Sequence, residues 1–317
     1  MEYNKQIADM LSGDDVEGFY VLKDAFLKTT AAGKPFLSGV LADRTGTIDL
    51  KVWDYSGPIG ANPGDIGRIV KIRGQVSEFK GAPQLTAGRI RMADSSDQYD
   101  VSALVPVAPI DPDARLQEID RLIDSMPDSD YRAVAREMLQ RHLSAFRSIP
   151  AAKSVHHSFL SGLLMHTSNM LKIADFLSGL YGDIIDRSLL LTGTLLHDFA
   201  KEREFAFSSL GMVTDYSMPG QLIGHLVMGA QEAAEVARQL QIPEEKSLLL
   251  QHMILSHHGE PEYGAAVRPM CAEAELLSEI DRIDSRMEIY AEALPEVPAG
   301  SFSARIFALD KKIYHHN

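Results

Sequence analysis

Histidine and aspartate recur through the second half of the chain in a pattern that suits a metal centre. The candidate residues stand in the order His156-His157, His166, His197-Asp198, His225, His257-His258 and Asp281. Each lies beside apolar residues of an expected helix, and His197-Asp198, for example, ends the apolar run Leu189 to Leu196. Imidazole and carboxylate groups on a buried helix face need a partner, because an unpaired buried polar group costs roughly 1–3 kcal/mol.

A divalent cation can satisfy several of these groups at once, because neutral imidazole and carboxylate are its ordinary ligands. A lone core histidine usually bonds to a backbone carbonyl, but that alternative does not account for the whole ordered set. Five histidines from His166 onward, with two aspartates, exceed what one ion needs and suit two metals roughly 3.5–4 Å apart. His197 and Asp198 can then meet one ion at the edge of its coordination sphere, or Asp198 can bridge two ions.

The elements that position these residues differ between the two halves of the chain. In residues 47–53, Ile48, Leu50 and Val52 share one face, and residues 69–74 alternate in the same way. Several short strands with turn signals between them predict a small antiparallel barrel. From about residue 112 onward, apolar residues recur at helical spacing.

We therefore predict a two-domain fold, with an all-β N-terminal domain and an all-α C-terminal domain. The expected parts are an N-terminal segment at 1–15, a barrel at 16–98, a linker at 99–113 and a helical domain at 114–317. Prolines 106, 109 and 112 mark the expected linker.

The charge of the chain is uneven. Its 317 residues carry a formal net charge of −13, which by itself argues against a nucleic-acid partner. Residues 16–92, however, hold eleven Lys/Arg against seven Asp/Glu, a surplus of four positive charges, so nucleic acid would bind there. The polar N-terminus, the single Cys271 and the lack of an apolar stretch of about 20 residues predict a cytoplasmic protein without a membrane partner.

The histidine and aspartate order resembles the HD-domain superfamily of metal-dependent phosphohydrolases, whose dinuclear members use the middle histidines. In the N-terminal half, the stretches 34–36, 43–46, 51–54 and 84–86 resemble an OB-fold of the type that binds single-stranded nucleic acid. An OB-fold followed by an HD domain, with His156-His157 and the stretch 253–259, resembles the YhaM-type 3′–5′ exoribonucleases. The resemblance covers about residues 16–310.

This resemblance implies roles for the motif residues. The primary metal site would be His166, His197, Asp198 and Asp281, and the second would be His225, His257 and His258, with Asp198 bridging. Lys201 would neutralise phosphate charge, or it is a solvated helix lysine. His156 and His157 would contact the scissile phosphate or protonate the leaving oxygen, or they cap local structure. Asp284 would orient a ligand histidine, or it forms a surface salt bridge.

On the barrel, exposed aromatic and basic side chains are the candidates for nucleic-acid binding. Phe36 and Trp53 are possible platforms for base stacking, which is worth roughly 1–3 kcal/mol per base; a core position at the barrel edge is the alternative for Trp53. The candidate phosphate contacts are Arg44, Lys51, Lys71 and Arg73. Arg44 could serve only to hold its turn.

These features predict a metal-dependent 3′–5′ exonuclease that hydrolyses single-stranded RNA to nucleoside 5′-monophosphates, with single-stranded DNA left open as a substrate. Two divalent ions are expected. Mn²⁺ is preferred because a mixed imidazole–carboxylate site without thiolates suits it, although Fe²⁺, Co²⁺, Ni²⁺ and Zn²⁺ share these ligands. A homo-oligomer is left open.

Two other functions remain open from the sequence. A cyclic-dinucleotide or nucleotide phosphodiesterase can use a similar ligand set. Enzymes acting on cyclic dinucleotides carry Gly-Tyr-Pro after the paired histidines, whereas this chain continues from His258 with Gly259-Glu260-Pro261. The other function is a non-catalytic nucleic-acid-binding module with a structural metal centre.

Overall fold

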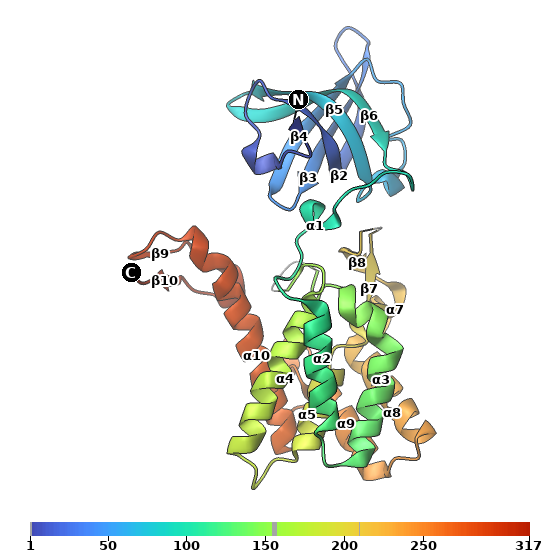
Figure 1. Ribbon diagram of the computed structural model, residues 1–317, viewed down its shortest axis with the longest axis vertical. Coiled ribbons are helices and arrows are strands. Elements are labelled where there is room, and N and C mark those ends of the chain that lie inside the picture. The colour runs from blue at the N-terminus through green and yellow to red at the C-terminus, as the bar shows by residue number, and fades with distance from the viewer. Residues whose placement is uncertain (1, 154–156, 209) are drawn as a thin grey trace. The chain divides into compact units, whose positions relative to one another are not determined.

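The computed structural model describes residues 2–153, 157–208 and 210–317. Its chain divides into two compact units, one ending at Val107 and the other beginning at Ala108, and a few residues near Ser208 group with the first. Strands build the N-terminal unit and helices build most of the C-terminal unit (Figure 1). The predicted fold class, a β barrel followed by a helical domain, is therefore confirmed.

Five long strands form the N-terminal barrel. They are β2 (Asp15–Thr29), β3 (Pro35–Asp43), β4 (Gly46–Trp53), β5 (Ile69–Phe79) and β6 (Ala82–Met92). Their order is β2-β3-β4-β6-β5, and β2 also pairs with β5, which closes the sheet. The sequence predicts an antiparallel barrel. The structure differs at one pairing, because β4 and β6 run parallel. A closed five-stranded barrel of this kind is the architecture of an OB-fold.

Alternation along the strands fills the barrel interior. Ile48, Leu50 and Val52 of β4 are buried, and Val70 and Ile72 of β5 join the same core. These residues point inward because successive side chains of a strand face opposite sides of the sheet. The outward positions of the same strands are thereby left free to carry aromatic and basic groups.

Strand β2 closes the barrel by pairing with two strands, β5 and β3. Its first half pairs with β5 and its second half pairs with β3, with a bulge between Leu22 and Asp24. Gly39 of β3 lies opposite this bulge, where an added Cβ would come within 2.4 Å of the Asp24 carbonyl oxygen. The glycine therefore permits the close approach that bends the sheet into a barrel.

The two segments that flank the barrel are ordered. Residues before β2 include β1 (Glu2–Tyr3), which pairs in parallel with β2, and a 3-10 turn at Ile7–Asp9. The expected linker contains helix α1 (Val101–Leu104) and the start of α2 (Pro112–Asp124). Asp100 and Asp111 cap these two helices by accepting hydrogen bonds from backbone N–H groups.

The C-terminal unit is a helical bundle with two small hairpins. Its longer helices are α2, α3 (Ser129–Ser148), α4 (Gly162–Leu180), α5 (Arg187–Leu196), α8 (His225–Gln239), α9 (Glu244–Ser256) and α10 (Ala272–Ala293). The shorter elements are α6 (Lys201–Glu204), α7 (Met218–Leu222), β7 (Phe205–Phe207), β8 (Val213–Tyr216), β9 (Ser301–Phe302), β10 (Tyr314–His315) and 3-10 turns at Pro261–Tyr263, Leu294–Glu296 and Phe307–Leu309. Over the described residues, every helix is too short or too polar to span a bilayer.

Helix α5 forms the centre of this bundle. Every residue from Ser188 to Leu196 is buried, and the helix packs against α3, α4, α9 and α10. A helix that is apolar on all sides must be surrounded by other helices, so α5 sets the position of its neighbours. Any polar residue that follows α5 without a break is consequently delivered into the interior.

A buried histidine outside the predicted metal set joins three helices. The Nδ1 atom of His142 on α3 lies 2.9 Å from Glu202 on α6, and its Nε2 atom lies 3.0 Å from Glu232 on α8. Burial lowers the pKa of His142, but these two hydrogen bonds outweigh burial and raise the pKa to about 9. His142 is therefore charged at neutral pH and bridges two carboxylates.

This bridge predicts a pH-dependent stability. Below the ordinary pKa of 6.5, His142 is protonated in both the folded and the unfolded chain, so its stabilisation is fully present. As the pH rises to about 9, only the folded chain keeps the proton, and the stabilisation is lost. Between these limits the unfolding free energy of the wild type should fall by at most roughly 3 kcal/mol relative to His142→Gln. Urea unfolding of both proteins across this range measures the difference, and parallel pH curves would contradict the bridge.

Candidate metal centre

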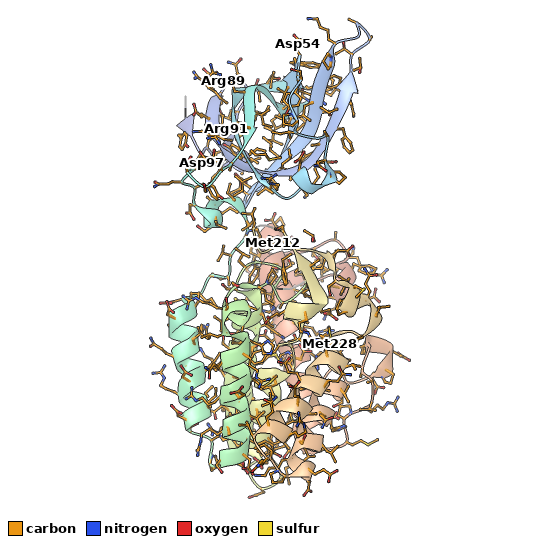
Figure 2. All side chains as sticks on the ribbon, turned by 90° about the vertical axis from the view of Figure 1, so that its right-hand side faces the viewer. Asp54, Arg89, Arg91, Asp97, Met212 and Met228 are labelled. Atoms are coloured by element: carbon orange, nitrogen blue, oxygen red, sulfur yellow. The ribbon has the colours of Figure 1, made fainter. Side chains whose placement is uncertain are left out.

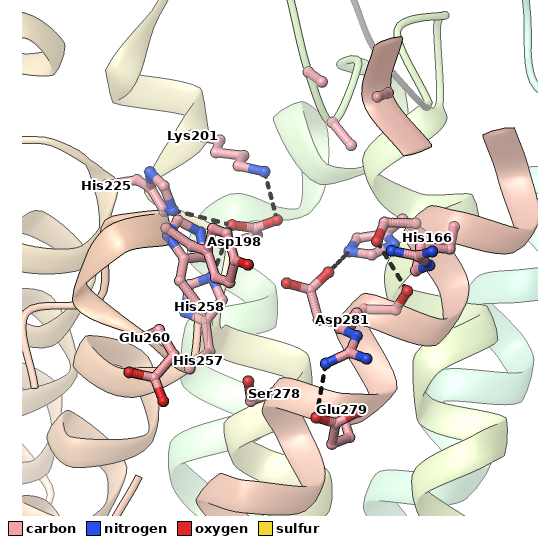
Figure 3. A pocket seen from close by; sticks show the side chains of 18 of the residues that line it. His166, Asp198, Lys201, His225, His257, His258, Glu260, Ser278, Glu279 and Asp281 are labelled. Carbon is pink, nitrogen blue, oxygen red and sulfur yellow. Dashed lines mark hydrogen bonds and ion pairs between the residues drawn. The ribbon is translucent and has the colours of Figure 1, made fainter. Parts of the chain in front are cut away.

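Five helices bring the seven predicted ligands together in the C-terminal unit. His166 projects from the first turns of α4, and Asp281 projects from the middle of α10. The two dipeptides directly follow helices: His197-Asp198 follows α5, and His257-His258 follows α9. His225 is the first residue of α8. Figure 3 shows His225, His257 and His258 gathered beside Asp198, and His166 beside Asp281.

Asp198 lies between two groups of imidazoles. One carboxylate oxygen, Oδ2, is 3.1 Å from Nε2 of His197. The other, Oδ1, is 3.4 Å from Nε2 of His225 and 3.7 Å from Nε2 of His257. The two oxygens thus face different sets of ligands, which is the arrangement that a bridging carboxylate requires.

The ligand atoms cluster on each side of this carboxylate. Potential ligand atoms of His225, His257 and His258 lie within 4.8 Å of one another, and so do those of His166, His197 and Asp198. The Nε2 atom of His166 also lies 3.3 Å from Oδ1 of Asp281. The geometry is compatible with two neighbouring cation sites that share Asp198.

Four of the imidazoles are held by a hydrogen bond at Nδ1. His197 and His257 each lie 2.8 Å from the backbone carbonyl three residues earlier, that of Thr194 or Ile254. His166 and His225 use carboxylates instead: Nδ1 lies 2.7 Å from Asp284 and 2.8 Å from Glu204, respectively. When such an imidazole is neutral, Nδ1–H donates to its acceptor and Nε2 keeps its lone pair toward the cluster, as a metal ligand needs. His197 after α5 and His257 after α9 are therefore oriented in the same way, each by the last turn of the preceding helix.

Several buried atoms of the cluster have no hydrogen-bond partner among the described residues. They are Nε2 of His197, Oδ1 of Asp198, Nε2 of His225 and Nδ1 of His258. Leaving each such atom unsatisfied costs roughly 1–3 kcal/mol. A divalent cation would satisfy imidazole nitrogen and carboxylate oxygen together, so these residues fit the metal ions that the sequence predicts.

Charge in the centre favours an ionised Asp198 and neutral imidazoles at His257 and His258. Burial raises the pKa of the Asp198 carboxyl, but Lys201 and His197 outweigh burial and hold this pKa well below its usual value. The Lys201 ammonium lies 2.7 Å from Oδ2 of Asp198. Burial, His197 and His258 lower the pKa of His257, and burial and His225 lower that of His258. Neutral imidazole is the form that binds a metal.

His166 has a different environment. Burial lowers its pKa, but hydrogen bonds to Asp281 and Asp284 outweigh burial and raise the pKa to about 9. The two carboxylates thus favour positive charge at this imidazole. A cation bound at Nε2 would meet the same electrostatic requirement.

The cluster opens onto a cavity of about 980 Å³. Six of the seven predicted ligands line it, and His197 lies behind them, fully buried. One wall is α10 from Glu275 to Ile289, and other walls include residues 151–153, Tyr216 and Tyr263. Lys201 also lines the cavity, so its ammonium is placed beside a bound anion as well as beside Asp198.

The predicted pair His156-His157 is only partly described. His156 lies outside the described residues. His157 is fully buried, contacts the ring of His166 at a centroid distance of 5.0 Å, and has Nε2 3.5 Å from Asp284. The residues that line the cavity do not include His157. A catalytic role for it therefore stays a prediction, and its contacts are those of a residue that supports His166.

Sequence reasoning missed Glu204. Its Oε1 atom accepts hydrogen bonds from both the backbone N–H and the ring of His225, at 3.0 and 2.8 Å. One carboxylate thereby satisfies the first N–H of α8 and orients a predicted ligand. The spacing of Glu204 from Asp198 resembles no metal motif, and only the folded path of α6 brings it to α8.

On the barrel, three of the predicted nucleic-acid contacts form a cluster. The rings of Phe36 and Trp53 lie 5.0 Å apart on paired positions of β3 and β4. The Lys51 ammonium lies 5.8 Å from the Phe36 ring and donates a hydrogen bond to Ser38. Trp53 is 51% exposed, so it is not a core residue. Its ring is available to a base.

A second cavity, of about 630 Å³, lies beside Trp53 on the barrel and is lined by Lys71 and Arg73 of β5. Arg89 and Arg91 of β6, labelled in Figure 2, also line this cavity, although they are not among the residues predicted from the sequence. They pair with Arg73 and Lys71 of β5, respectively. Arg91 is bound to Asp97 through two hydrogen bonds of 2.6 Å. The predicted Arg44 is exposed on the β3–β4 turn and does not line this cavity.

Comparison with known proteins identifies a family and a relative by sequence. Residues 163–286 match the family model described as HD domain. The 3′–5′ exoribonuclease YhaM of Halalkalibacterium halodurans is 38% identical over 308 residues, which cover 96% of this chain and 93% of that protein. The match therefore includes both structural units.

Two solved OB-fold domains are similar to part of the chain. The second OB-fold domain of replication protein A from Methanococcus maripaludis is 16% identical and matches with a TM-score of 0.23, covering 31% of this chain and 100% of that one. An OB domain from Thermoplasma acidophilum is 15% identical with a TM-score of 0.25, and covers 31% of this chain and 92% of that one.

Glu204→Gln is expected to weaken metal binding. Glutamine keeps the size of the side chain but loses the charge that holds the His225 ring, and removing such a partner costs roughly 10–100-fold in metal affinity. Titration calorimetry with Mn²⁺ measures the change, and Glu235→Gln on the exposed face of α8 is the matched control. Equal affinity of the two variants would show that Glu204 does not orient a ligand.

Proposed function

The chain belongs to the YhaM family of 3′–5′ exoribonucleases, and from this membership we propose that it is a metal-dependent 3′–5′ exonuclease. Its substrate would be single-stranded RNA, shortened from the 3′ end to nucleoside 5′-monophosphates. The observation that carries the proposal is the position of Asp198, whose two oxygens face separate groups of imidazoles at the wall of a large cavity. Such a centre suits attack on a phosphodiester bond.

Two divalent ions, with Mn²⁺ preferred, would be held by the clustered side chains. The first would bind to His166, His197, Asp198 and Asp281, and the second to His225, His257, His258 and the shared Asp198. When bound, the ions would polarise the phosphate and lower the pKa of a water molecule. The unsatisfied Nε2 atoms of His197 and His225 support this assignment.

The protein's own residues would orient the reactants. Lys201 lines the cavity and lies 2.7 Å from Asp198, so it would keep that carboxylate in place and offset phosphate charge. Attack of water on the last phosphodiester breaks the bond to the 3′-oxygen of the penultimate nucleotide. That oxygen would take a proton from water in the open cavity. The contacts of His157 with His166 and Asp284 support a positioning role for it.

The barrel would hold the single strand. Stacking on Trp53 and Phe36 is indifferent to base identity, which suits an exonuclease that must process every sequence. Lys71, Arg73 and Arg89 would contact phosphates along the neighbouring cavity. The same surface would accept single-stranded DNA, because stacking and phosphate contacts do not read the 2′-hydroxyl.

The first prediction is the direction of cleavage. With Mn²⁺ and 5′-labelled single-stranded RNA, the wild type should give a ladder that shortens from the 3′ end, and EDTA should abolish it. Asp198→Asn should lower the rate by more than the roughly 100-fold expected from loss of a merely orienting residue. Asp183→Asn, at an exposed carboxylate of the same unit, is the control.

Gel analysis of the time course, with DNA of the same sequence beside the RNA, decides the proposal. Full activity of Asp198→Asn at unchanged metal content would exclude the proposed centre. Strands that are bound but remain intact with every divalent ion would indicate a binding module. Release of internal fragments would indicate an endonuclease.

A further prediction concerns the barrel. Trp53→Ala should weaken binding of single-stranded RNA by roughly 10-fold, since one stacked base is worth about 1–3 kcal/mol. Fluorescence anisotropy in EDTA measures the Kd without cleavage. Phe79→Ala removes an aromatic ring of similar exposure at the β5–β6 turn and should change the Kd little. Equal losses in both variants would argue against a specific stacking site at Trp53.

A further inference from the structure

The cavity runs along helix α10 on both sides of Asp281. Its lining residues run from Glu275 to Ile289, which corresponds to roughly 21 Å of helix. The metal ligand Asp281 lies between these limits. The cavity therefore has room for more of a strand than the phosphate at the metal centre.

The two directions along α10 differ in charge. On the N-terminal side of Asp281, the helix lines the cavity with Glu275 and Glu279, and Glu260 lies on the same side (Figure 3). On the C-terminal side, it contributes Arg282 and Arg286. Arg282 forms an ion pair with Glu279 at 3.3 Å, and Glu260 forms one with Arg268 at 2.8 Å. The charge difference along the described part of α10 therefore rests on Glu275 on the first side and Arg286 on the second, and a polyanionic strand is repelled by the former and attracted by the latter.

Arg286 differs from the other cations of the cavity. Lys153, Lys201 and Arg282 each pair with a carboxylate, at 3.0, 2.7 and 3.3 Å. For Arg286, no carboxylate lies within 4.0 Å in the parts of the chain that the structure describes, and the residue is partly buried. A guanidinium without an ion pair is free to bind a phosphate through two parallel hydrogen bonds.

We propose that Arg286 binds the phosphate on the 5′ side of the scissile bond. The strand then reaches Asp281 from the C-terminal part of α10, and its last nucleoside lies toward Glu275 and Glu279. This polarity matches the chemistry of a 3′ end, since internal nucleotides each carry a phosphate whereas the last nucleoside ends in a neutral hydroxyl. The inference rests on the proposed function, because it requires a strand whose 3′ end occupies the metal centre.

Dinucleotides that differ only in the position of one phosphate test this polarity. The 5′-phosphorylated form of adenylyl-adenosine carries its extra phosphate where Arg286 would bind it, whereas the 3′-phosphorylated form carries the same charge at the opposite end. The unmodified dinucleotide has neither. The Kd of each for the full-length protein is measured by equilibrium dialysis in EDTA, and kcat/KM is measured with Mn²⁺.

In the wild type, the 5′-phosphorylated dinucleotide should bind roughly 10-fold more tightly than the unmodified one, as expected for one charge-assisted contact. Arg286→Gln should abolish this advantage and leave the Kd of the unmodified dinucleotide unchanged, and Arg286→Lys should restore part of it. Arg238→Gln, at an exposed arginine on α8, should behave as the wild type. The affinity of the 3′-phosphorylated dinucleotide should not depend on Arg286.

Three results would overturn the inference: no effect of Arg286→Gln, an equal loss with all three dinucleotides, or a loss confined to the 3′-phosphorylated one. The last would mean that the strand runs in the opposite direction. These outcomes are distinguishable from failure of the proposed function. If long RNA is not shortened but the 5′-phosphate advantage still depends on Arg286, the exonuclease proposal fails and the phosphate site stands.

Discussion

The helical unit is arranged around one buried carboxylate. Asp198 is only 2% exposed, and a carboxylate removed from water costs several kcal/mol unless opposite charge and hydrogen-bond donors surround it. Lys201 forms an ion pair with one of its oxygens, and the imidazoles of His225 and His257 face the other. The ends of α5, α8 and α9 must therefore meet at one point. The proposed cations would satisfy what the side chains leave unpaired, so the same constraint that organises the bundle would also create its chemistry.

Helix ends do most of this positioning. Helix α5 is buried from Ser188 to its last residue and is followed directly by His197-Asp198, so its burial carries a polar dipeptide into the core. Helix α9 ends in the same way at His257-His258, with an equivalent hydrogen bond from the ring to the preceding turn. The C-terminal ends of helices carry partial negative charge, which favours cations beside them. The opposite end of α8 carries partial positive charge, and Glu204 neutralises it while holding His225.

The clustering of these histidines and aspartates could be predicted from the sequence because polar residues that interrupt apolar helix periodicity are conspicuous. The alternation around Leu50 likewise predicted the barrel, and the change from strand to helical periodicity across the proline-marked linker predicted two domains. Strand β2 was less visible, because it changes partner at a bulge and its burial pattern loses strict alternation there. Glu204 and Arg286 could not be recognised, since each acts through neighbours that are distant in sequence. Arg89 was missed for the same reason, because only the pairing of β5 with β6 places it beside Arg73.

The separation of the ligands along the chain has a thermodynamic consequence. His166 near the start of the helical unit and Asp281 near its end lie together in the proposed centre, so ions bound there would act as a cross-link between α4 and α10. An unfolded chain lacks this convergence, and binding to the folded form alone adds about 2.7 kcal/mol of stability at a free-ion concentration of one hundred times Kd. The barrel supplies none of these ligands and gains nothing directly. Metal supply would thus raise the stability of the helical unit as well as control its activity, whereas the nucleic-acid binding proposed for the barrel would not depend on metal.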